Sequence, residues 1–305
     1  MKQNNKLIVS IGTTAFNEEG NIRNFLNSVC GQKEKNIIIK EIIVISDGST
    51  DNTVNVVKKY QDKRVKLITS LKRLGKPSRL NQLFRKFTGD LLVFFDSDVI
   101  LKDTLVVERL VRKFKTDENL GLVSGNPMPL PARTFIEKAI NNFLNNRERL
   151  KSAYNFKNSP YAVHGRTMAF SKKFINELNL PVDILGDDGF SYLSCKEKGY
   201  NFCYQKKAVV WFRSPQTVKD YINQATRFLA GTPQLYQYFG HDLVDQEYQV
   251  PKRIKVKMML LQLKDNPLGY FILKLLHFYC LWKSKSYLKQ FNIRWSSVRS
   301  SKQLY

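Results

Sequence analysis

The chain has 305 residues, 43% of them hydrophobic, and a formal net charge of +24. This composition excludes an intrinsically disordered chain, and the length suits one large domain or one domain with an appendage. The four cysteines lie far apart without a C-x-x-C pair, which excludes the usual patterns of a zinc site or a disulfide framework.

Much of the positive charge lies late in the sequence. Residues 251–305 carry twelve Lys and Arg against one acid, Asp265, a net charge of +11. An excess of this size predicts a polyanionic partner or surface. The opening residues run from a polar start into an apolar strand without the features of a signal peptide, so we expect a cytoplasmic protein.

Apolar strands and amphipathic helices alternate over the first hundred residues. The hydrophobic pattern predicts a helix after each of the first three strands, and strands at residues 7–11, 37–45, 65–69 and 91–95. Short loops join these elements, which is typical of a doubly wound parallel sheet.

The pattern continues with less regular spacing. It predicts a helix at 105–114, a strand at 121–125, a Pro-rich bend at 127–131 and a helix at about 134–154. A strand followed by a basic turn is expected within 161–174, and a helix opened by an acidic loop within 185–200. The last elements are a strand around Val209 and a helix from Pro215.

The stretch Leu91–Asp98 organises this pattern. Five large apolar residues predict a strand buried on both faces, and Asp96 and Asp98 follow it directly. Ligands of open α/β sheets bind at the carboxyl ends of strands, and a D-x-D pair there offers oxygen ligands to a divalent cation held by a diphosphate. The alternative is that one Asp caps a helix and the other is solvated.

Two further acidic positions lie far away in the sequence. Asp47 ends the predicted strand 37–45, and Asp187 and Asp188 open a predicted helix. Folding could bring both positions to the rim that carries Asp96 and Asp98. Each of these carboxylates, taken alone, could equally cap a helix or stabilise a turn.

Six short motifs in this order resemble the family 2 glycosyltransferases of the glycosyltransferase-A fold, over roughly residues 6–231. They are TAFNEE, SDGSTD, the GK before a helix, DSD, GDD and QATRF. The resemblance implies a Rossmann-like, doubly wound mixed sheet flanked by helices, followed by a basic helical tail. It also implies inverting, metal-dependent transfer of a sugar from a nucleotide donor, expected to be a UDP-sugar, to a hydroxyl of a saccharide or lipid-linked acceptor in cell-surface polysaccharide or glycolipid synthesis.

The resemblance assigns donor-side roles residue by residue. Asp47 would accept a hydrogen bond from uracil, and Asp98 would be the direct ligand of Mg²⁺ or Mn²⁺, with Asp96 near the ribose and the metal. Other positions expected to contact the nucleotide sugar are Ala15, Glu18, Ser97 and Lys76, or Arg79 beside it.

On the acceptor side the resemblance assigns Asp188 as the catalytic base. Gln224 and Arg227 would steady the acceptor and the departing diphosphate, while Asp187 would cap the helix or contact the acceptor. His164 is a further candidate for substrate contact. These residue types suit the reaction, because a leaving diphosphate needs positive charge and an attacking hydroxyl needs a base.

Two departures from the family bear on the product. Phe228 stands where processive members have tryptophan after the arginine, and the several membrane helices that flank those members are not found in this sequence. Both departures favour transfer of one or a few sugars over synthesis of a polymer.

The apolar stretch Leu268–Trp282 has 15 residues, whereas a bilayer span needs about 20. On a helix one face would carry Leu268, Phe271, Leu275, Phe278 and Trp282, flanked by Lys264, Lys283, Lys285 and Lys289. This pattern predicts an interfacial helix on anionic lipid at the inner face of the membrane, or alternatively a helix packed on the catalytic domain or a second subunit.

We therefore expect a catalytic domain at 1–235, with a nucleotide-sugar half at 1–100 and an acceptor half at 101–235, and a basic amphipathic tail at 236–305. A sugar nucleotidyltransferase is a second hypothesis, but TTAFNEEG lacks the glycine-rich, arginine-bearing loop of that class. A nucleic-acid-binding protein is a third, supported by charge alone, so we expect no nucleic acid partner. The oligomeric state stays open.

Overall fold

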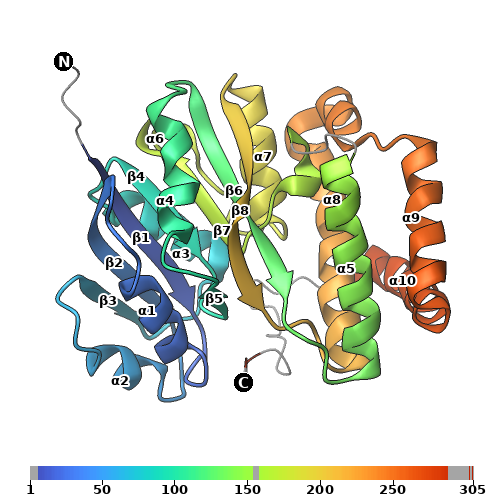
Figure 1. Ribbon diagram of the computed structural model, residues 1–305, viewed down its shortest axis with the longest axis horizontal. Coiled ribbons are helices and arrows are strands. Elements are labelled where there is room, and N and C mark those ends of the chain that lie inside the picture. The colour runs from blue at the N-terminus through green and yellow to red at the C-terminus, as the bar shows by residue number, and fades with distance from the viewer. Residues whose placement is uncertain (1–5, 154–157, 288–301, 303, 305) are drawn as a thin grey trace.

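The computed structural model describes residues 6–153, 158–287, 302 and 304. Within this part of the chain a mixed sheet of eight strands runs in the order β3-β2-β1-β4-β7-β6-β8-β5 (Figure 1). The strands are β1 (Leu7–Ala15), β2 (Ile37–Asp47), β3 (Val65–Ser70), β4 (Leu91–Phe95), β5 (Val99–Leu101), β6 (Leu120–Pro129), β7 (Thr167–Ser171) and β8 (Asn201–Phe212).

Ten α-helices are described along the same ranges. They are α1 (Ile22–Cys30), α2 (Thr53–Lys58), α3 (Lys76–Lys86), α4 (Val106–Val111), α5 (Phe135–Ala153), α6 (Lys172–Glu177), α7 (Asp187–Glu197), α8 (Val218–Tyr248), α9 (Lys252–Asp265) and α10 (Pro267–Tyr287). Gly240, with φ of 74°, interrupts α8.

The direction of the strands makes the sheet mixed, as expected for this fold. β1, β2, β3 and β4 pair in parallel, and β6 and β8 continue in the same direction. β7 lies antiparallel between β4 and β6, and β5 pairs antiparallel with β8. The carboxyl ends of β1, β2 and β4 therefore share one edge of the sheet.

Helices cover both faces of the sheet. α1, α2 and α4 pack on one face through one apolar cluster, and α3, α6 and α7 pack on the other through a second cluster. All five residues of β4 are buried as a result, which explains its continuous apolar sequence. The predicted doubly wound organisation is confirmed.

The structure corrects two local predictions. The Pro-rich bend is in part a strand, because β6 continues to Pro129. Within the described ranges β7 pairs with β6 only at Leu122–Ser124, so beyond that point one side of β6 faces no described strand. Such an open side tolerates prolines, which have no backbone N–H to donate. The basic turn after β7 is the helix α6, which Ser171 caps by accepting a hydrogen bond from the Phe174 N–H.

A second helical layer stands beside the sheet (Figure 1). α10 packs along α5 and α8, where Leu273 is buried against Ile136, Ala139 and Ile140. No helix within the described ranges is both long enough and apolar enough to cross a bilayer. The opposite face of α10 carries exposed large apolar side chains, including Leu275 and Trp282, each 71% exposed.

Candidate functional site

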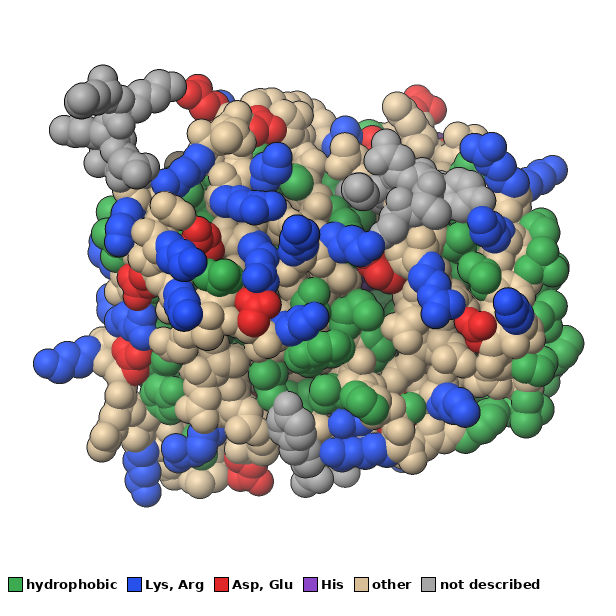
Figure 2. Space-filling model, in the orientation of Figure 1, with side chains coloured by type: hydrophobic (Ala, Val, Ile, Leu, Met, Phe, Trp, Pro, Cys, Tyr) green, Lys and Arg blue, Asp and Glu red, His purple; other side chains and the backbone are tan. Residues whose placement is uncertain are grey.

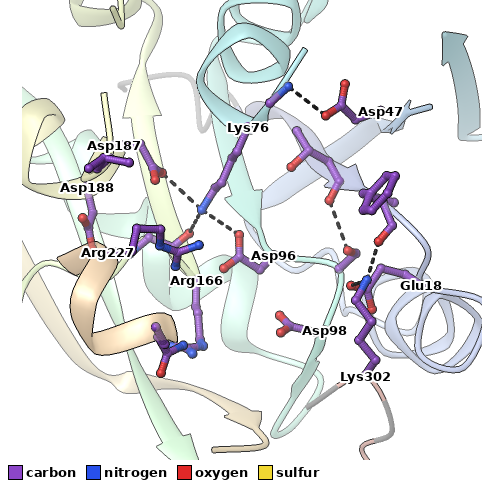
Figure 3. A pocket seen from close by; sticks show the side chains of 18 of the residues that line it. Glu18, Asp47, Lys76, Asp96, Asp98, Arg166, Asp187, Asp188, Arg227 and Lys302 are labelled. Atoms are coloured by element: carbon purple, nitrogen blue, oxygen red, sulfur yellow. Dashed lines mark hydrogen bonds and ion pairs between the residues drawn. The ribbon is translucent and has the colours of Figure 1, made fainter. Parts of the chain in front are cut away.

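A pocket opens at the carboxyl ends of β1, β2 and β4, and the start of α7 and the first third of α8 close its other side (Figure 3). It brings together the acidic positions that the sequence places far apart. Of the thirteen residues expected at the site, eleven line this pocket: Ala15, Glu18, Asp47, Lys76, Asp96, Ser97, Asp98, Asp187, Asp188, Gln224 and Arg227.

Lys76 lies at the centre of the pocket. It begins α3 directly after Gly75, and its Nζ is 2.8 Å from Asp96 Oδ1, 3.1 Å from Asp187 Oδ2 and 3.3 Å from the Gly165 carbonyl oxygen. Burial alone would lower the pKa of Lys76, but the Asp187 and Asp96 carboxylates outweigh it and raise this pKa. Lys76 is therefore a permanent cation that joins the strand-end acids to the α7 acids.

Asp98 has a different environment from Asp96. Its Oδ1 is buried and has no hydrogen-bond partner among the described residues. Burial, and then repulsion from Asp96, raise the pKa of Asp98. A buried carboxylate oxygen without a partner is costly, so this atom is suited to a cation that comes from outside the chain. No group of three or more His, Cys, Asp or Glu in the described ranges could hold a metal by itself.

Asp47 fixes the loop before α3. Its Oδ1 accepts hydrogen bonds from Leu74 N–H and Arg79 Nε, both at 2.7 Å, and its Oδ2 accepts one from Gly75 N–H at 2.9 Å. A carboxylate has about four acceptor positions, so one position on Oδ2 remains for a further donor. Arg79 does not line the pocket; it is 4% exposed and acts on the pocket through this ion pair.

Asp187 and Asp188 open α7 with different orientations. Asp188 Oδ2 accepts a hydrogen bond from Gly165 N–H at 3.1 Å, and its Oδ1 accepts one from Gly189 N–H. Asp187 is buried beside Lys76, and burial raises its pKa against the opposing effect of that lysine. A Cβ at Gly165 would lie 3.3 Å from Lys76 Nζ and 3.4 Å from Asp187 Oδ2, so the glycine permits this close arrangement.

The loop after β1 forms the wall beside Asp98. Its Asn17 has φ of 53°, a conformation that Asn tolerates better than most residues. Backbone N–H groups of the loop donate to side chains of the SDGSTD loop, Asn17 to Ser49 and Glu19 to Asp51, and to the first residue of α2, Glu18 to Thr53. Burial, and then Asp98, raise the pKa of Glu18 to about 7, although Lys302 opposes the shift.

The pocket also has lining residues that the sequence did not predict, among them Arg73, Phe16, Arg166 and Lys302. Arg73 and Phe16 contact each other, with the guanidinium carbon 3.7 Å from the ring centroid. Arg166 stacks on Phe212, with its guanidinium carbon 4.0 Å from the ring centroid. Lys302 reaches the pocket from the other end of the sequence, and no local pattern marks it.

His164 lies beside the pocket and not on its lining. Its ring nitrogens are 3.2 and 3.3 Å from Arg147 Nη2, and Nε2 is 3.3 Å from Lys151 Nζ. Burial and these two cations hold the pKa of His164 well below its usual value, so the ring is neutral near pH 7. The predicted contact of His164 with substrate therefore has no direct support in its position.

Comparison with known proteins decides the family. The model of glycosyl transferase family 2 matches residues 10–178. The chain belongs to this family. The predicted family, glycosyltransferase-A fold and enzyme class are confirmed. The comparisons give no support to the nucleotidyltransferase and nucleic-acid-binding hypotheses.

The relatives of this family 2 glycosyltransferase include poly-beta-1,6-N-acetyl-D-glucosamine synthases. That of Staphylococcus aureus strain MSSA476 is 24% identical over 242 residues, which are 76% of this chain and 54% of the relative. That of Staphylococcus epidermidis is 22% identical over 249 residues, 79% of this chain and 56% of the relative. The chain thus spans little more than half the length of these relatives.

A solved structure shares the fold. It is the mannosyltransferase PcManGT from Pyrobaculum calidifontis in complex with GDP-Man and Mn²⁺. The TM-score is 0.60 at 19% sequence identity, over 93% of this chain and 75% of that chain. The likeness extends over the helical layer as well as the sheet.

The QATRF motif lies on α8 at the pocket edge. Burial lowers the pKa of Arg227, and its guanidinium carbon is 5.2 Å from the centroid of the Phe228 ring. Phe228 lines the pocket and is 52% exposed, so the position that differs from processive members of the family is open to solvent.

Proposed function

We propose that this family 2 glycosyltransferase is inverting and metal-dependent, and that it moves a sugar from a UDP-sugar to a hydroxyl acceptor in cell-surface polysaccharide or glycolipid synthesis. One observation carries the proposal: DSD at the end of β4 faces GDD at the start of α7 across one pocket, with Lys76 between them (Figure 3). The DSD carboxylates, proposed to hold the metal, and the GDD carboxylates, proposed to include the catalytic base, then flank the space where a donor sugar would lie.

The proposed metal is Mg²⁺ or Mn²⁺, and the site residues fit it. Asp98 offers a buried oxygen that has no hydrogen-bond partner in the described part of the chain, and Asp96 lies beside it. Both are the hard oxygen ligands that these ions prefer. When bound, the ion would neutralise charge that develops on the departing diphosphate. Arg227 and Arg166, which line the same pocket, would add positive charge to that side.

Asp188 is the proposed base. Its two backbone hydrogen bonds fix the carboxylate and leave acceptor positions free, so it can take the proton of an attacking hydroxyl. Attack from the side opposite the leaving diphosphate inverts the anomeric carbon. Asp47 retains one acceptor position for a base N–H, which supports its proposed contact with uracil.

Thermal unfolding with UDP and Mn²⁺ tests the donor and the metal together. A ligand at about 100 times its dissociation constant stabilises the folded state by about 2.7 kcal/mol. We expect UDP to raise the midpoint of the wild type only when Mn²⁺ is present, and Asp98→Ala to lose that response. A response to GDP or TDP instead would change the proposed nucleobase of the donor. No response to any of the three nucleotides would refute the assignment of the pocket as a donor site.

The helical layer suggests where the enzyme works. Val256 and Leu260 of α9 and Leu268, Leu275 and Trp282 of α10 are at least half exposed, and hydrophobic side chains gather along this edge of the molecule (Figure 2). The five residues predicted as the lipid-facing stripe of α10 are all exposed. Of the lysines predicted to flank them, Lys264 and Lys285 are exposed and Lys283 is half-buried, while Lys289 lies outside the described residues. Lys255 and Lys274 are further exposed lysines on α9 and α10.

We propose that this edge rests on an anionic membrane at the inner face of the cell, and that residues 236–305 hold the catalytic domain there. Apolar insertion and basic flanks together are typical of interfacial binding. A lipid-linked acceptor would then approach the enzyme from the membrane. The face of α10 that packs on α5 and α8 keeps this edge attached to the domain.

Sedimentation with vesicles tests the attachment. We expect Leu275→Asp to lower the bound fraction on vesicles with anionic lipid, and neutral vesicles to bind less of the wild type. Leu71→Asp is the matched control, because Leu71 is fully exposed in the loop after β3, outside the α9 and α10 edge. Equal recovery of wild type and Leu275→Asp would exclude this face as the attachment.

A further inference from the structure

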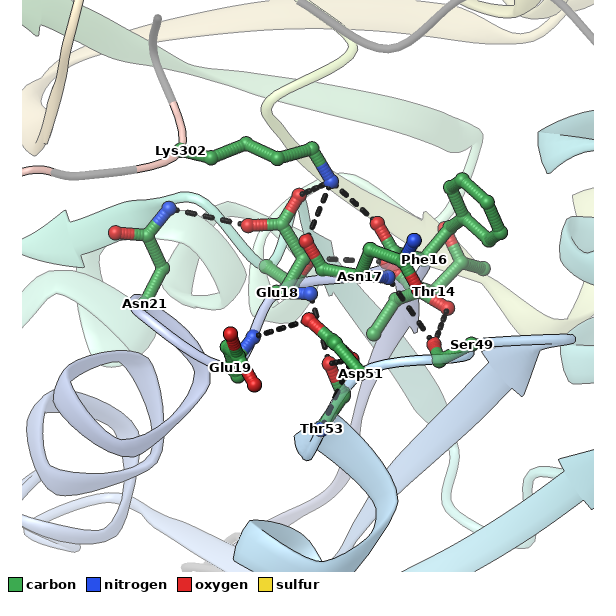
Figure 4. A network of polar contacts seen from close by, with 12 residues as sticks. Thr14, Phe16, Asn17, Glu18, Glu19, Asn21, Ser49, Asp51, Thr53 and Lys302 are labelled. Carbon is green, nitrogen blue, oxygen red and sulfur yellow. Dashed lines mark hydrogen bonds and ion pairs between the residues drawn. The ribbon is translucent and has the colours of Figure 1, made fainter. Parts of the chain in front are cut away.

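Lys302 makes an unusually complete contact with the loop after β1 (Figure 4). Its Nζ donates hydrogen bonds to the carbonyl oxygens of Phe16 and Asn17, and lies 2.9 Å from Glu18 Oε1. A lysine ammonium has three donors and no acceptor. The three oxygens of this one loop therefore fill its donor capacity.

Leu304 anchors the same segment two residues later. It is 1% exposed, its N–H donates to Asn21 Oδ1 at 3.1 Å, and its carbonyl oxygen accepts from Arg213 Nη2 at 2.8 Å. Asn21 Nδ2 in turn donates to Glu18 Oε2 at 3.0 Å. The Glu18 carboxylate is thus held at one oxygen by Lys302 and at the other by Asn21, which Leu304 orients.

The loop has two sides with different supports. Its N–H groups are held by Ser49 and Asp51 of the SDGSTD loop and by Thr53 at the start of α2. Its carbonyl groups at Phe16 and Asn17 point the other way, toward Lys302 (Figure 4). Two neighbouring carbonyl dipoles and a carboxylate repel one another without a cation, so the conformation of the pocket wall depends on this ammonium.

We propose that Lys302 and Leu304 form a clasp that fixes the loop Phe16–Glu18 for binding of the donor nucleotide. Lys302 is thus a positioning residue of the donor site, and this role rests on the proposed function of the pocket. Among the described residues its ion pair within 4 Å is with Glu18, and neither Asp96 nor Asp98 is paired with it. An ammonium that instead blocked the metal position would be expected to pair with those two carboxylates.

The opposite role makes an opposite prediction. If Lys302 were a plug that the ligand must displace, removing its charge would strengthen nucleotide binding. If it is a clasp, removing the charge frees the loop and weakens binding, because the ligand must then order the loop itself. The sign of the change therefore decides between the two.

Calorimetric titration with UDP and Mn²⁺ measures that sign. We expect Lys302→Met to raise the Kd about tenfold, the equivalent of about 1.4 kcal/mol, and Lys302→Arg to recover part of the loss. Turnover at saturating donor should stay within about twofold of wild type, since a positioning residue for binding acts on KM. Lys198→Met is the matched control, an exposed lysine at the end of α7.

Hydrogen exchange of the ligand-free protein gives a second readout. We expect the amides of residues 17–21 to exchange faster in Lys302→Met than in wild type, with core strands such as β4 unchanged. Unchanged exchange, or an equal or lower Kd in Lys302→Met, would overturn the clasp while leaving the proposed function intact. A wild type that binds neither UDP nor GDP with Mn²⁺ would overturn the proposed function, and the donor-binding role of the clasp with it.

Discussion

Removal of the Lys76 charge should destabilise the fold in a way that depends on pH. The ammonium lies 2.8 Å from Asp96 and 3.1 Å from Asp187, and the three side chains are 18%, 26% and 10% exposed. Loss of one partner of a buried ion pair costs about 3–5 kcal/mol, and the remaining exposure places Lys76→Met near the lower end, at about 3 kcal/mol at pH 7.

The pH dependence follows from the carboxylates left behind. Burial already raises the pKa of Asp187, and without Lys76 this pKa rises further. Between the pKa of Asp187 in the unfolded chain and its higher pKa in the folded variant, the folded variant binds more protons than the unfolded chain. The stability of the variant therefore falls as pH rises through that interval. Protonation at pH 5 relieves part of the repulsion, and the loss of stability in Lys76→Met should be smaller at pH 5 than at pH 7.

Urea unfolding followed by circular dichroism measures the loss of stability at each of the two pH values. Wild type, Lys76→Met and the control Lys198→Met are compared at pH 5 and pH 7, with the slope against urea checked for constancy. A loss below about 0.5 kcal/mol at pH 7 would place Lys76 among ordinary surface residues and refute the argument. So would an equal loss at the two pH values.

Three further predictions follow from the site and its support. Asp98→Asn should keep or raise the thermal midpoint, because it removes a charge that Asp96 repels, yet it should abolish the Mn²⁺-dependent response to UDP. Asp188→Asn should lower kcat by about 10²–10⁴-fold with UDP affinity within about twofold in calorimetry, and weakened UDP binding would instead assign it to the donor. Glu137→Ala should cost about 3–5 kcal/mol in urea unfolding, because Glu137 and Arg213 form an ion pair that is 0% and 4% exposed; a loss near zero would mean that Arg213 finds another partner.

The sequence predicted the strands that local pattern determines. β4 is a continuous apolar run and β2 a nearly continuous one, and strands of a parallel sheet can bring their carboxyl ends to one edge, which is why Asp47, Asp96 and Asp98 were expected on one rim. The three-residue β5 and the antiparallel direction of β7 depend on pairing with distant strands and leave no local signal. The family resemblance supplied the mixed sheet, which periodicity alone does not predict.

The candidate site divides in the same way. Residues inside motifs were found, whereas Lys302 contacts Glu18 across 284 positions of sequence, and its own surroundings are an ordinary basic stretch. Arg166 was passed over because a single arginine beside a strand has no periodic or spacing signature. Arg79 shows the opposite case. Its motif predicted a contact with the nucleotide, but in the structure its partner is the Asp47 carboxylate.

The charge balance of the pocket explains why metal and nucleotide should bind together. Six acids line it: Glu18, Asp47, Asp96, Asp98, Asp187 and Asp188. Five cations oppose them: Arg73, Lys76, Arg166, Arg227 and Lys302. A diphosphate alone would add negative charge to a wall that already carries Asp98, whose buried oxygen no described residue contacts through a hydrogen bond. A divalent cation alone would find too few ligands among the described side chains. Each supplies what the other lacks, so we expect UDP and Mn²⁺ together to stabilise the protein by more than the sum of their separate effects.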